Sequence, residues 1–221
     1  MIRLHHVPQA RSFRILWLLE EMGETFEVAI HSFFDRSLRS DDYLALSPAG
    51  RVPALEVDGQ VLFESGAITE WLCETRAPDL GRAPGAPERA EWLEWLHFAE
   101  TAGQHLAALT QQHIVLREDW MRSPTVMRLE AMRLARVLAV ADRVLQGHDW
   151  LLPSGFSAVD VAMGYSALTA RRFVRLDDLP ALAGWLDRIA ARPAYQRAQA
   201  RDGAAQVYTR DFYEVPDDGA R

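Results

Sequence analysis

The first eighty residues change hydrophobic period several times. Alternating polar and apolar side chains, typical of β-strands, occur at residues 2–7, 26–30, 52–57 and 60–64. Helical spacing of apolar side chains occurs at residues 12–22 and 41–46, and again from residue 65. Gly23 is a favourable helix stop, and Asp58-Gly59 is a strong signal for a tight hairpin. The pattern predicts the order β-α-β-α followed by β-β-α.

The remainder of the chain has a different organisation. Residues 77–87 contain three prolines and two glycines, which is typical of a linker. Helical periodicity continues to about residue 201, and the last nineteen residues are polar and aromatic. The predicted divisions are an α/β domain (1–78), a linker (79–87), an all-helical domain (88–202) and a C-terminal tail (203–221).

Composition narrows the class of protein. The chain has 221 residues, of which 49% are hydrophobic, so it can bury a sizeable core. Its 24 basic and 31 acidic residues give a net charge of −7, which argues against a nucleic-acid partner. No apolar run is long enough to span a membrane or to serve as a signal peptide. We therefore expect a soluble, cytoplasmic protein without a membrane partner.

Two residue counts exclude particular chemistries. All 24 basic residues are arginine, so Schiff-base and phosphate-loop lysines are impossible. Cys73 is the single cysteine, which excludes an internal disulfide and a multi-cysteine zinc site, and we expect it to be buried. Glu94 and His97 match only half of a di-iron helix motif, so no metal is predicted.

Two patterns in the first domain suggest binding of a small ligand. In the first, Pro53 enters a strand, where it lacks a donor; either Val52-Pro53 is a cis peptide that presents the Val52 backbone, or this is an ordinary edge strand. In the second, Ser65 begins a helix whose free amides suit a carboxylate, while Glu64 suits an ammonium. Together the second pair fits an amino-acid head group, although a capping Ser beside a solvated Glu explains the same residues.

A third pattern lies between the first strand and the first helix. A hydroxyl at a helix N-terminus can donate to a thiolate and lower its pKa, as the helix dipole also does. Ser12 is the candidate for this role, and simple N-capping is its alternative.

Taken together, these segments resemble the cytosolic glutathione transferases. The resemblance is carried by residues 11–23 (RSFRILWLLEEMG), 47–55 (SPAGRVPAL) and 64–68 (ESGAI), and it extends over nearly the whole chain. It implies a thioredoxin-like N-terminal domain that binds glutathione, followed by an all-α domain. It also implies a capping box between Ser157 and Asp160 in the helical domain.

The resemblance assigns roles to several residues. It implies that Val52 pairs its backbone with the cysteinyl part of glutathione and that Pro53 is cis. Glu64 and Ser65 hold the γ-glutamyl head, while Arg51 and, second, Arg39 contact a carboxylate. The second-substrate pocket is expected between the domains, lined or covered by Trp120, Tyr165, Tyr208 and Phe212.

The thiol-activating position departs from the family pattern. Related members often carry Ser, Thr or Asn just before Arg11, where this chain has Gln9 and Ala10. Ser12 and Arg11 are the predicted catalytic residues, with the helix amides and His5 or His6 as further sources. Lowering a thiol pKa by two units needs roughly 2.7 kcal/mol, and one hydroxyl donor supplies only about 1 to 1.5 kcal/mol. A charged or dipolar partner is therefore expected beside the hydroxyl.

The resulting functional hypothesis is a detoxifying glutathione transferase. Glutathione serves as co-substrate, its thiol attacks a hydrophobic small molecule, and the family implies a homodimer. Two alternatives remain: a glutathione-dependent peroxidase or disulfide reductase, and a non-catalytic ligand-binding or interaction protein of the same fold.

Overall fold

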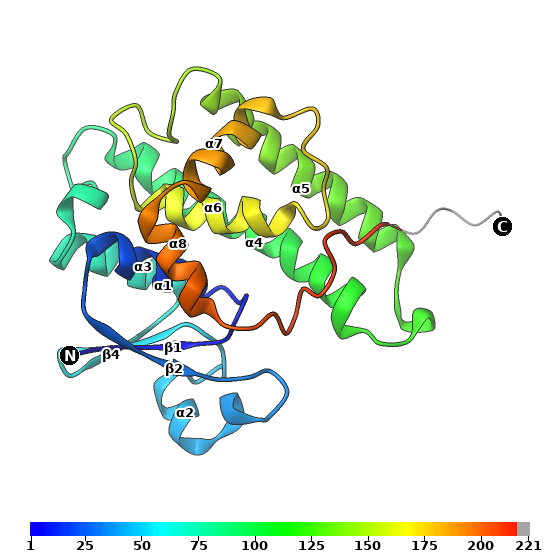
Figure 1. Cartoon of the computed structure of the whole chain (residues 1–221), viewed down its shortest axis with the longest axis horizontal. Coiled ribbons are helices and arrows are strands. Elements are labelled where there is room, and N and C mark those ends of the chain that lie inside the picture. Colours follow the sequence, from blue (N-terminus) through cyan, green and yellow to red (C-terminus); the bar gives the residue numbers. More distant parts are fainter. Residues whose placement is uncertain (216–221) are drawn as a thin grey trace. The chain divides into compact units, whose positions relative to one another are not determined.

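The N-terminal part of the chain forms the predicted mixed α/β arrangement. A computed structural model describes residues 1–215. Its elements here are β1 (Ile2–His6), α1 (Phe13–Met22), β2 (Phe26–Ile30), the short helix η1 (Ser37–Arg39), α2 (Asp41–Leu46), β3 (Ala54–Val57), β4 (Gln60–Phe63) and α3 (Ser65–Thr75). Figure 1 shows α1 and α3 on one side of the sheet and α2 on the other.

The four strands run in the order β2-β1-β3-β4. Strand β1 is parallel to β2 and antiparallel to β3, and β3 pairs with β4 through the Asp58-Gly59 hairpin. Helix α1 lies against the sheet on one side and against a later helix on the other. Its residues from Phe13 to Glu20 are therefore buried, as are Leu4 and Leu55 of the sheet.

That later helix is α8 (Pro193–Asp202), which packs along α1. The Tyr195 ring lies 5.0 Å from the Trp17 ring and 5.9 Å from the Phe13 ring, both edge-on. The Arg192 guanidinium donates to both carboxylate oxygens of Glu21, each at 2.7 Å, in the two-pronged geometry that only arginine offers.

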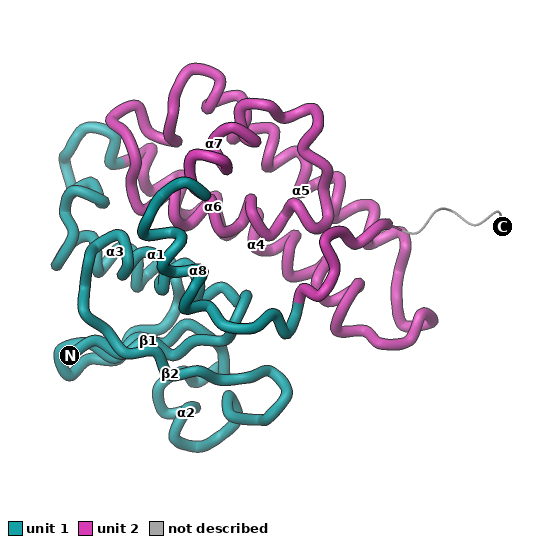
Figure 2. Tube along the Cα trace, viewed as in Figure 1, with its two compact units in different colours: residues 1–89, 190–207 teal, residues 90–189, 208–221 magenta. Residues whose placement is uncertain are grey.

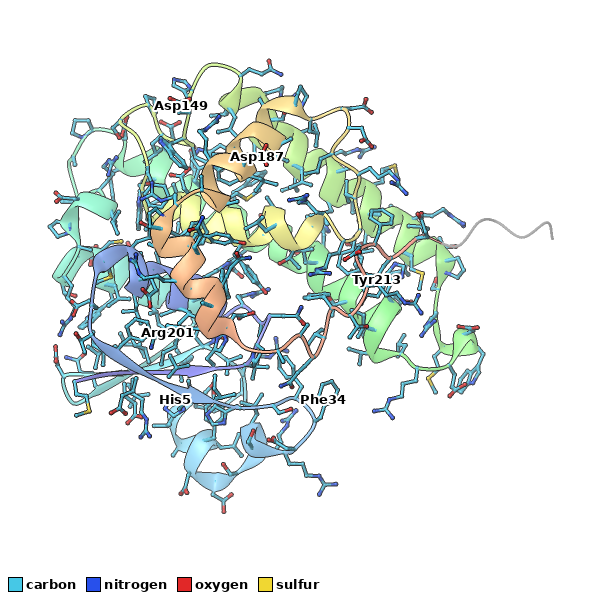
Figure 3. The ribbon with its side chains drawn as sticks, in the orientation of Figure 1. His5, Phe34, Asp149, Asp187, Arg201 and Tyr213 are labelled. Carbon is cyan, nitrogen blue, oxygen red and sulfur yellow. The ribbon has the colours of Figure 1, made fainter. Side chains whose placement is uncertain are left out.

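Glu20 makes the second ionic contact of this packing. Its carboxylate accepts from Arg197 at 2.8 Å and from Arg201, labelled in Figure 3, at 2.7 Å. Burial alone would raise the pKa of Glu20, but the hydrogen bonds and charges of Arg197 and Arg201 outweigh it and hold that pKa below 4.5, its ordinary value.

This packing changes the predicted domain division. The chain separates into one compact unit of residues 1–89 and 190–207 and another of residues 90–189 and 208–221, coloured separately in Figure 2. Residues 190–202 therefore group with the N-terminal unit, whereas periodicity placed them in the helical domain. An apolar period reveals that a helix has a buried face, but not which unit covers that face.

The second unit is helical. It contains α4 (Arg89–Thr110), a π-helical turn η3 (Gln111–Val115), a short helix η4 (Asp119–Met121), α5 (Pro124–Leu145), α6 (Ala158–Ala170) and α7 (Pro180–Ala190). Helix α6 is buried along most of its length, so the core of the unit forms around it.

Two buried aspartates organise this unit. Asp160 accepts hydrogen bonds from the backbone N–H groups of Ser157 (2.9 Å) and Leu151 (3.0 Å) and from the indole of Trp185 (3.0 Å). The Ser157–Asp160 pair is thus the capping box at the start of α6. Asp142 of α5 accepts from the Leu182 amide at 2.9 Å and so satisfies the first turn of α7.

The described part of the predicted tail is anchored at one buried side chain. Tyr213 is 5% exposed, and its amide donates to the Arg172 carbonyl at 2.7 Å. Residues 216–221 of that predicted segment lie outside the described residues. Within residues 1–215, no helix combines the length and apolar character needed to cross a bilayer.

The Glu20 contacts predict a specific acid response. Glu20→Gln removes the charge-assisted hydrogen bonds to Arg197 and Arg201 and should lower the free energy of unfolding at pH 7 by about 1 to 3 kcal/mol. Because the folded pKa lies below the unfolded value of 4.5, the contribution is complete above that pH and is lost as pH falls through the folded pKa. Urea unfolding from pH 7 to pH 3 should therefore show the gap between wild type and Glu20→Gln closing.

Glu27→Gln is the matched control, because the Arg3–Glu27 pair is exposed and 3.6 Å apart. It should change stability by less than about 1 kcal/mol. A gap for Glu20→Gln that stays constant down to pH 3 would contradict the assignment.

Candidate functional site

Three segments of the N-terminal unit meet at one end of the sheet. The register pairs His5 with Ala54 and Ala54 with Phe63, so the residues just beyond these pairs lie next to one another. They belong to the loop after β1, the turn before β3 and the start of α3. A small core beneath them contains Val7, Leu38, Tyr43 and Ala54, with Ala10, Leu46 and Val52 packed against it. Predicted ligand-binding residues from distant parts of the chain are thereby brought together.

The turn before β3 is held by hydrogen bonds to Arg51. The Arg51 carbonyl accepts from the hydroxyl of Tyr43 at 2.6 Å and from that of Ser47 at 2.8 Å, while the Arg51 amide donates to Ser47 at 3.3 Å. Burial raises the pKa of Tyr43 to about 12, so its phenol stays protonated and able to donate. The Arg51 side chain itself is exposed.

Gly50 sits inside this turn with φ +60°, which favours glycine. A Cβ at this position would lie 2.7 Å from the Leu38 carbonyl and 3.6 Å from a guanidinium nitrogen of Arg39. The close approach brings the exposed Arg39 side chain beside the turn that carries Arg51. Both predicted carboxylate contacts therefore lie at the same turn.

Val52 and Pro53 follow directly. Their peptide bond is cis, the form that the family resemblance implies. Strand β3 begins at Ala54, so the backbone of Val52 lies just before the strand and outside the sheet ladder.

The start of α3 has an unusual backbone. Glu64, with φ +71° and ψ +116°, occupies the N-cap, so Ser65 is the first helical residue rather than the cap itself. The Ser65 side chain is buried and accepts a hydrogen bond from Arg14 of α1 at 3.2 Å. Non-glycine residues with such φ values concentrate at functional sites, where the surrounding structure holds them in place.

Ser12 is completely buried at the start of α1, and it makes no capping bond. Its oxygen accepts from the Val7 amide at 3.3 Å and lies 2.9 Å from Nδ1 of His6. Direct donation from Ser12 to a ligand thiolate, the predicted role, requires this hydroxyl to leave His6. The neighbouring Arg11 side chain is partly exposed.

The two histidines that were candidate thiol partners are both engaged. His6 lies between Ser12 and Asp202 of α8, at 3.1 Å from the Asp202 carboxylate. His5 contacts Glu56 and His31, each at 2.9 Å, and is labelled in Figure 3. Burial and the neighbouring charge of His5 lower the pKa of His31.

The residues predicted to line a second-substrate pocket lie in the helical unit. Trp120 is 80% exposed on η4, and Tyr165 is half-buried on α6. Tyr208 shares a hydrogen bond of 2.9 Å with Thr110, and the Arg172 guanidinium lies over its ring.

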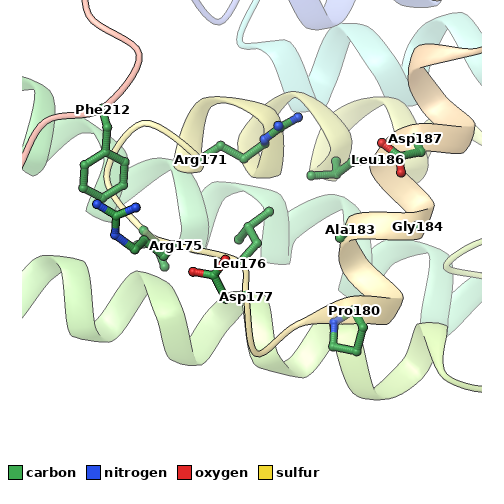
Figure 4. Close-up of a pocket in the computed structure, with 11 residues that line it drawn as sticks. Arg171, Arg175, Leu176, Asp177, Pro180, Ala183, Gly184, Leu186, Asp187 and Phe212 are labelled. Atoms are coloured by element: carbon green, nitrogen blue, oxygen red, sulfur yellow. The ribbon is translucent and has the colours of Figure 1, made fainter.

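The same unit contains a pocket of about 670 Å³. Its lining combines arginine, aspartate and apolar side chains from the α6–α7 connection and from α7, and Phe212 covers one end over Arg175 (Figure 4). Of the residues predicted for the second-substrate pocket, Phe212 lines this one, whereas Trp120, Tyr165 and Tyr208 do not.

Cys73 is buried in α3. Burial raises the pKa of this thiol to about 12, so it is not a nucleophile at neutral pH. Among residues 1–215, no three His, Cys, Asp or Glu side chains are grouped closely enough to hold a metal ion.

Comparison with known proteins shows the family of the chain. The family model "Glutathione S-transferase, N-terminal domain" matches residues 10–75. Glutathione S-transferase 3 of Zea mays is 30% identical over 210 residues, covering 90% of this chain and 93% of the maize protein. The chain belongs to the glutathione S-transferase family.

Two further relatives widen the range of activities within this glutathione S-transferase family. The disulfide-bond oxidoreductase YfcG of Escherichia coli is 28% identical, covering 90% of this chain and 94% of YfcG. A glutathione transferase from Pseudomonas putida, solved with one glutathione disulfide per subunit, is 25% identical with a TM-score of 0.80, and the match covers 91% of this chain and 92% of that one.

Three residues that hold this candidate site in place were missed by sequence reasoning. They are Arg14, which contacts Ser65, Tyr43, which holds the Arg51 carbonyl, and Asp202, which contacts His6. Only Arg14 leaves a sequence signal, because it interrupts the apolar run of α1. The other two act on residues at least eight positions away, which no local pattern reveals.

The backbone at Glu64 yields a testable prediction. Glu64→Gly and Glu64→Ala both remove the carboxylate, but only glycine adopts φ +71° without steric cost. Urea unfolding should find the glycine variant more stable than the alanine variant by about 1 kcal/mol, even though glycine has more freedom to lose on folding. Equal stabilities, or a more stable alanine variant, would show that the backbone at residue 64 is not constrained.

Proposed function

We propose that this protein is a glutathione transferase that binds glutathione on its N-terminal unit and activates the thiol for attack on a hydrophobic electrophile. The supporting observation is the convergence of Val52, the start of α3 and the loop after β1 at one end of the sheet. The polar groups of glutathione can each be matched with a protein group of suitable charge or hydrogen-bonding capacity in these segments.

The γ-glutamyl head matches the start of α3. Its carboxylate suits the free amides of the first helical turn, and its ammonium suits the Glu64 carboxylate. The Ser65 hydroxyl is oriented from behind by Arg14. In the middle of the ligand, the cysteinyl backbone pairs with Val52, which lies just outside the ladder.

The glycine carboxylate matches the arginines at the turn before β3. Arg51 is exposed there and Arg39 lies beside the same turn, so either guanidinium can form a two-pronged contact. Because the chain has no lysine, any cationic side chain in this role is arginine.

Thiol activation is assigned to the loop that ends at Ser12. A charge-assisted hydrogen bond is worth about 1.5 to 3 kcal/mol, which is enough for a two-unit drop in pKa when helix amides assist it. Arg11 is the charged candidate. Ser12 acts directly if its hydroxyl leaves His6, and otherwise acts by holding the loop.

Ultraviolet titration of the bound thiolate tests this proposal. In the wild type, the pKa of bound glutathione should lie about two units below the free thiol value of about 8.5. Arg11→Ala should raise it by about one unit or more, whereas Arg11→Lys, which keeps a positive charge, should retain part of the effect.

Ser12→Ala completes the series. Activity unchanged in both alanine variants would reject both residues as activators. A wild-type protein that leaves the thiol pKa near 8.5 would reject conjugation through a stabilised thiolate, and failure to bind glutathione at millimolar concentration would reject glutathione chemistry altogether.

Glutathione-dependent disulfide reduction is the second candidate, and the likeness to YfcG supports it. It uses the same bound thiolate, since Cys73 is buried and cannot supply one. The products discriminate the two activities: a thioether indicates transfer, and oxidised glutathione formed from a disulfide substrate indicates reduction.

The expected setting is a cytoplasmic homodimer active in detoxification. Trp92 and Trp95 of α4 are buried, so they offer no aromatic surface to a second copy. The exposed apolar side chains Val126, Leu129 and Met132 are instead spaced three residues apart along α5, and they support a contact between two copies.

A further inference from the structure

The end of α8 contacts the loop after β1 through a chain of buried polar groups. Ser12 and His6 have no exposed surface, and the Asp202 carboxylate is mostly covered. Asp202 lies 190 residues from Ser12 in sequence, yet only the His6 ring separates their side chains.

The two oxygens at the Asp202 end fix one direction in this chain of hydrogen bonds. His6 Nε2 lies 3.1 Å from Oδ1 of Asp202 and 3.2 Å from the Asp202 carbonyl, so it carries a proton and donates to them. Ser12 Oγ lies 2.9 Å from Nδ1 of the same ring, accepts from the Val7 amide at 3.3 Å and is 3.4 Å from the Val7 carbonyl, to which its hydroxyl can donate. Asp202 thereby orients the His6 ring, and the His6 ring holds the Ser12 side chain in place.

Asp202 also reaches the middle of the loop. Its two carboxylate oxygens accept from the Gln9 amide at 3.1 and 3.2 Å, and Gln9 has φ +63°, an uncommon value outside glycine. A carboxylate from α8 therefore holds the loop at its most constrained residue.

The chain beyond Asp202 completes the contact. The Gln9 side-chain oxygen accepts from the amides of Gln206 and Val207, at 3.1 and 3.0 Å. Gly203 has φ +97°, and a Cβ there would lie 3.1 Å from Pro8. The loop and the segment 202–207 are thus joined through both backbone and side chains.

From this geometry we propose that Asp202 is a positioning residue for thiol activation: through His6, Ser12 and the Gln9 amide it holds the loop 7–12 in the conformation that directs Arg11 and the first amides of α1 toward the glutathione sulfur. The proposal rests on the function proposed above. It assigns to α8 and the segment after it control over the reactivity of the thiol, without contact with the substrate.

Substitution of Asp202 separates position from charge. Asp202→Ala removes the acceptor of both His6 and Gln9, while Asp202→Asn keeps an oxygen that can accept from both. Asp202→Ala should raise the pKa of bound glutathione by about one unit and lower kcat about tenfold at pH 7, with KM for glutathione changed less than about twofold. Asp202→Asn should restore most of both.

A second readout needs no glutathione. In Asp202→Ala, hydrogen exchange of a peptide covering residues 7–12 should become about tenfold faster, and Asp202→Asn should stay close to the wild type. Gln199→Ala is the matched control, since Gln199 is exposed on the same helix and contacts only Tyr195. Asp202→Ser, whose short side chain cannot reach both His6 and the Gln9 amide, replaces Asp202→Ala should the latter fail to fold.

The outcomes of these experiments distinguish failure of the positioning role from failure of the proposed function. A normal thiol pKa and normal exchange in Asp202→Ala overturn the positioning role, and an asparagine variant that behaves like alanine shows that charge, not position, is what matters. If the wild type fails to bind glutathione, the proposed function fails, while the exchange experiment still decides whether Asp202 holds the loop.

Discussion

Helix α8 is held against α1 by arginine–carboxylate contacts, and the geometry of the candidate site depends on them. Glu20 and Glu21 receive three arginines from one face of the packing, and Tyr195 fills the space beside Trp17 and Phe13. Buried carboxylates are stable only when such partners satisfy them. These contacts anchor α8, and its last residue, Asp202, contacts His6 and the Gln9 amide. Ionic contacts along α1 therefore help to hold the loop that precedes α1.

The sheet explains why ligand chemistry concentrates at one end of the unit. Antiparallel pairing of β3 with β1 and with β4 brings the end of β1, the start of β3 and the end of β4 together at one end of the sheet. Each of these ends leaves the ladder and exposes backbone groups that the sheet does not use. Tyr43 and Arg14 then hold the turn before β3 and the start of α3 from within. Contacts within the chain therefore hold the turn and the helix start in place, which reduces the ordering cost of binding.

The helical unit uses the same principle with aspartates. Asp160 accepts from the amides of Ser157 and Leu151 and from the Trp185 indole of α7, and Asp142 satisfies the first turn of α7, so two buried carboxyl groups replace what solvent would provide. Of the side chains that the sequence suggested for a second-substrate pocket, Phe212 lines the pocket of about 670 Å³ in this unit, because the chain after Tyr208 folds back and places the Phe212 ring over Arg175.

The order of strands and helices and the hairpin at Asp58-Gly59 were predictable from sequence, because each depends on residues close together in the chain. The ligand contacts assigned to Val52, Glu64 and Ser65 stay predictions. Period 2, period 3.6 and turn residues are local signals. The sequence could not show that α8 packs with the N-terminal unit, or that the Ser12 hydroxyl is taken by His6. The packing of α8 depends on contacts between residues as many as 196 positions apart. Ser12 and His6 are only six positions apart, but no periodic pattern shows which buried donor meets which acceptor, because the packing of the folded chain selects it.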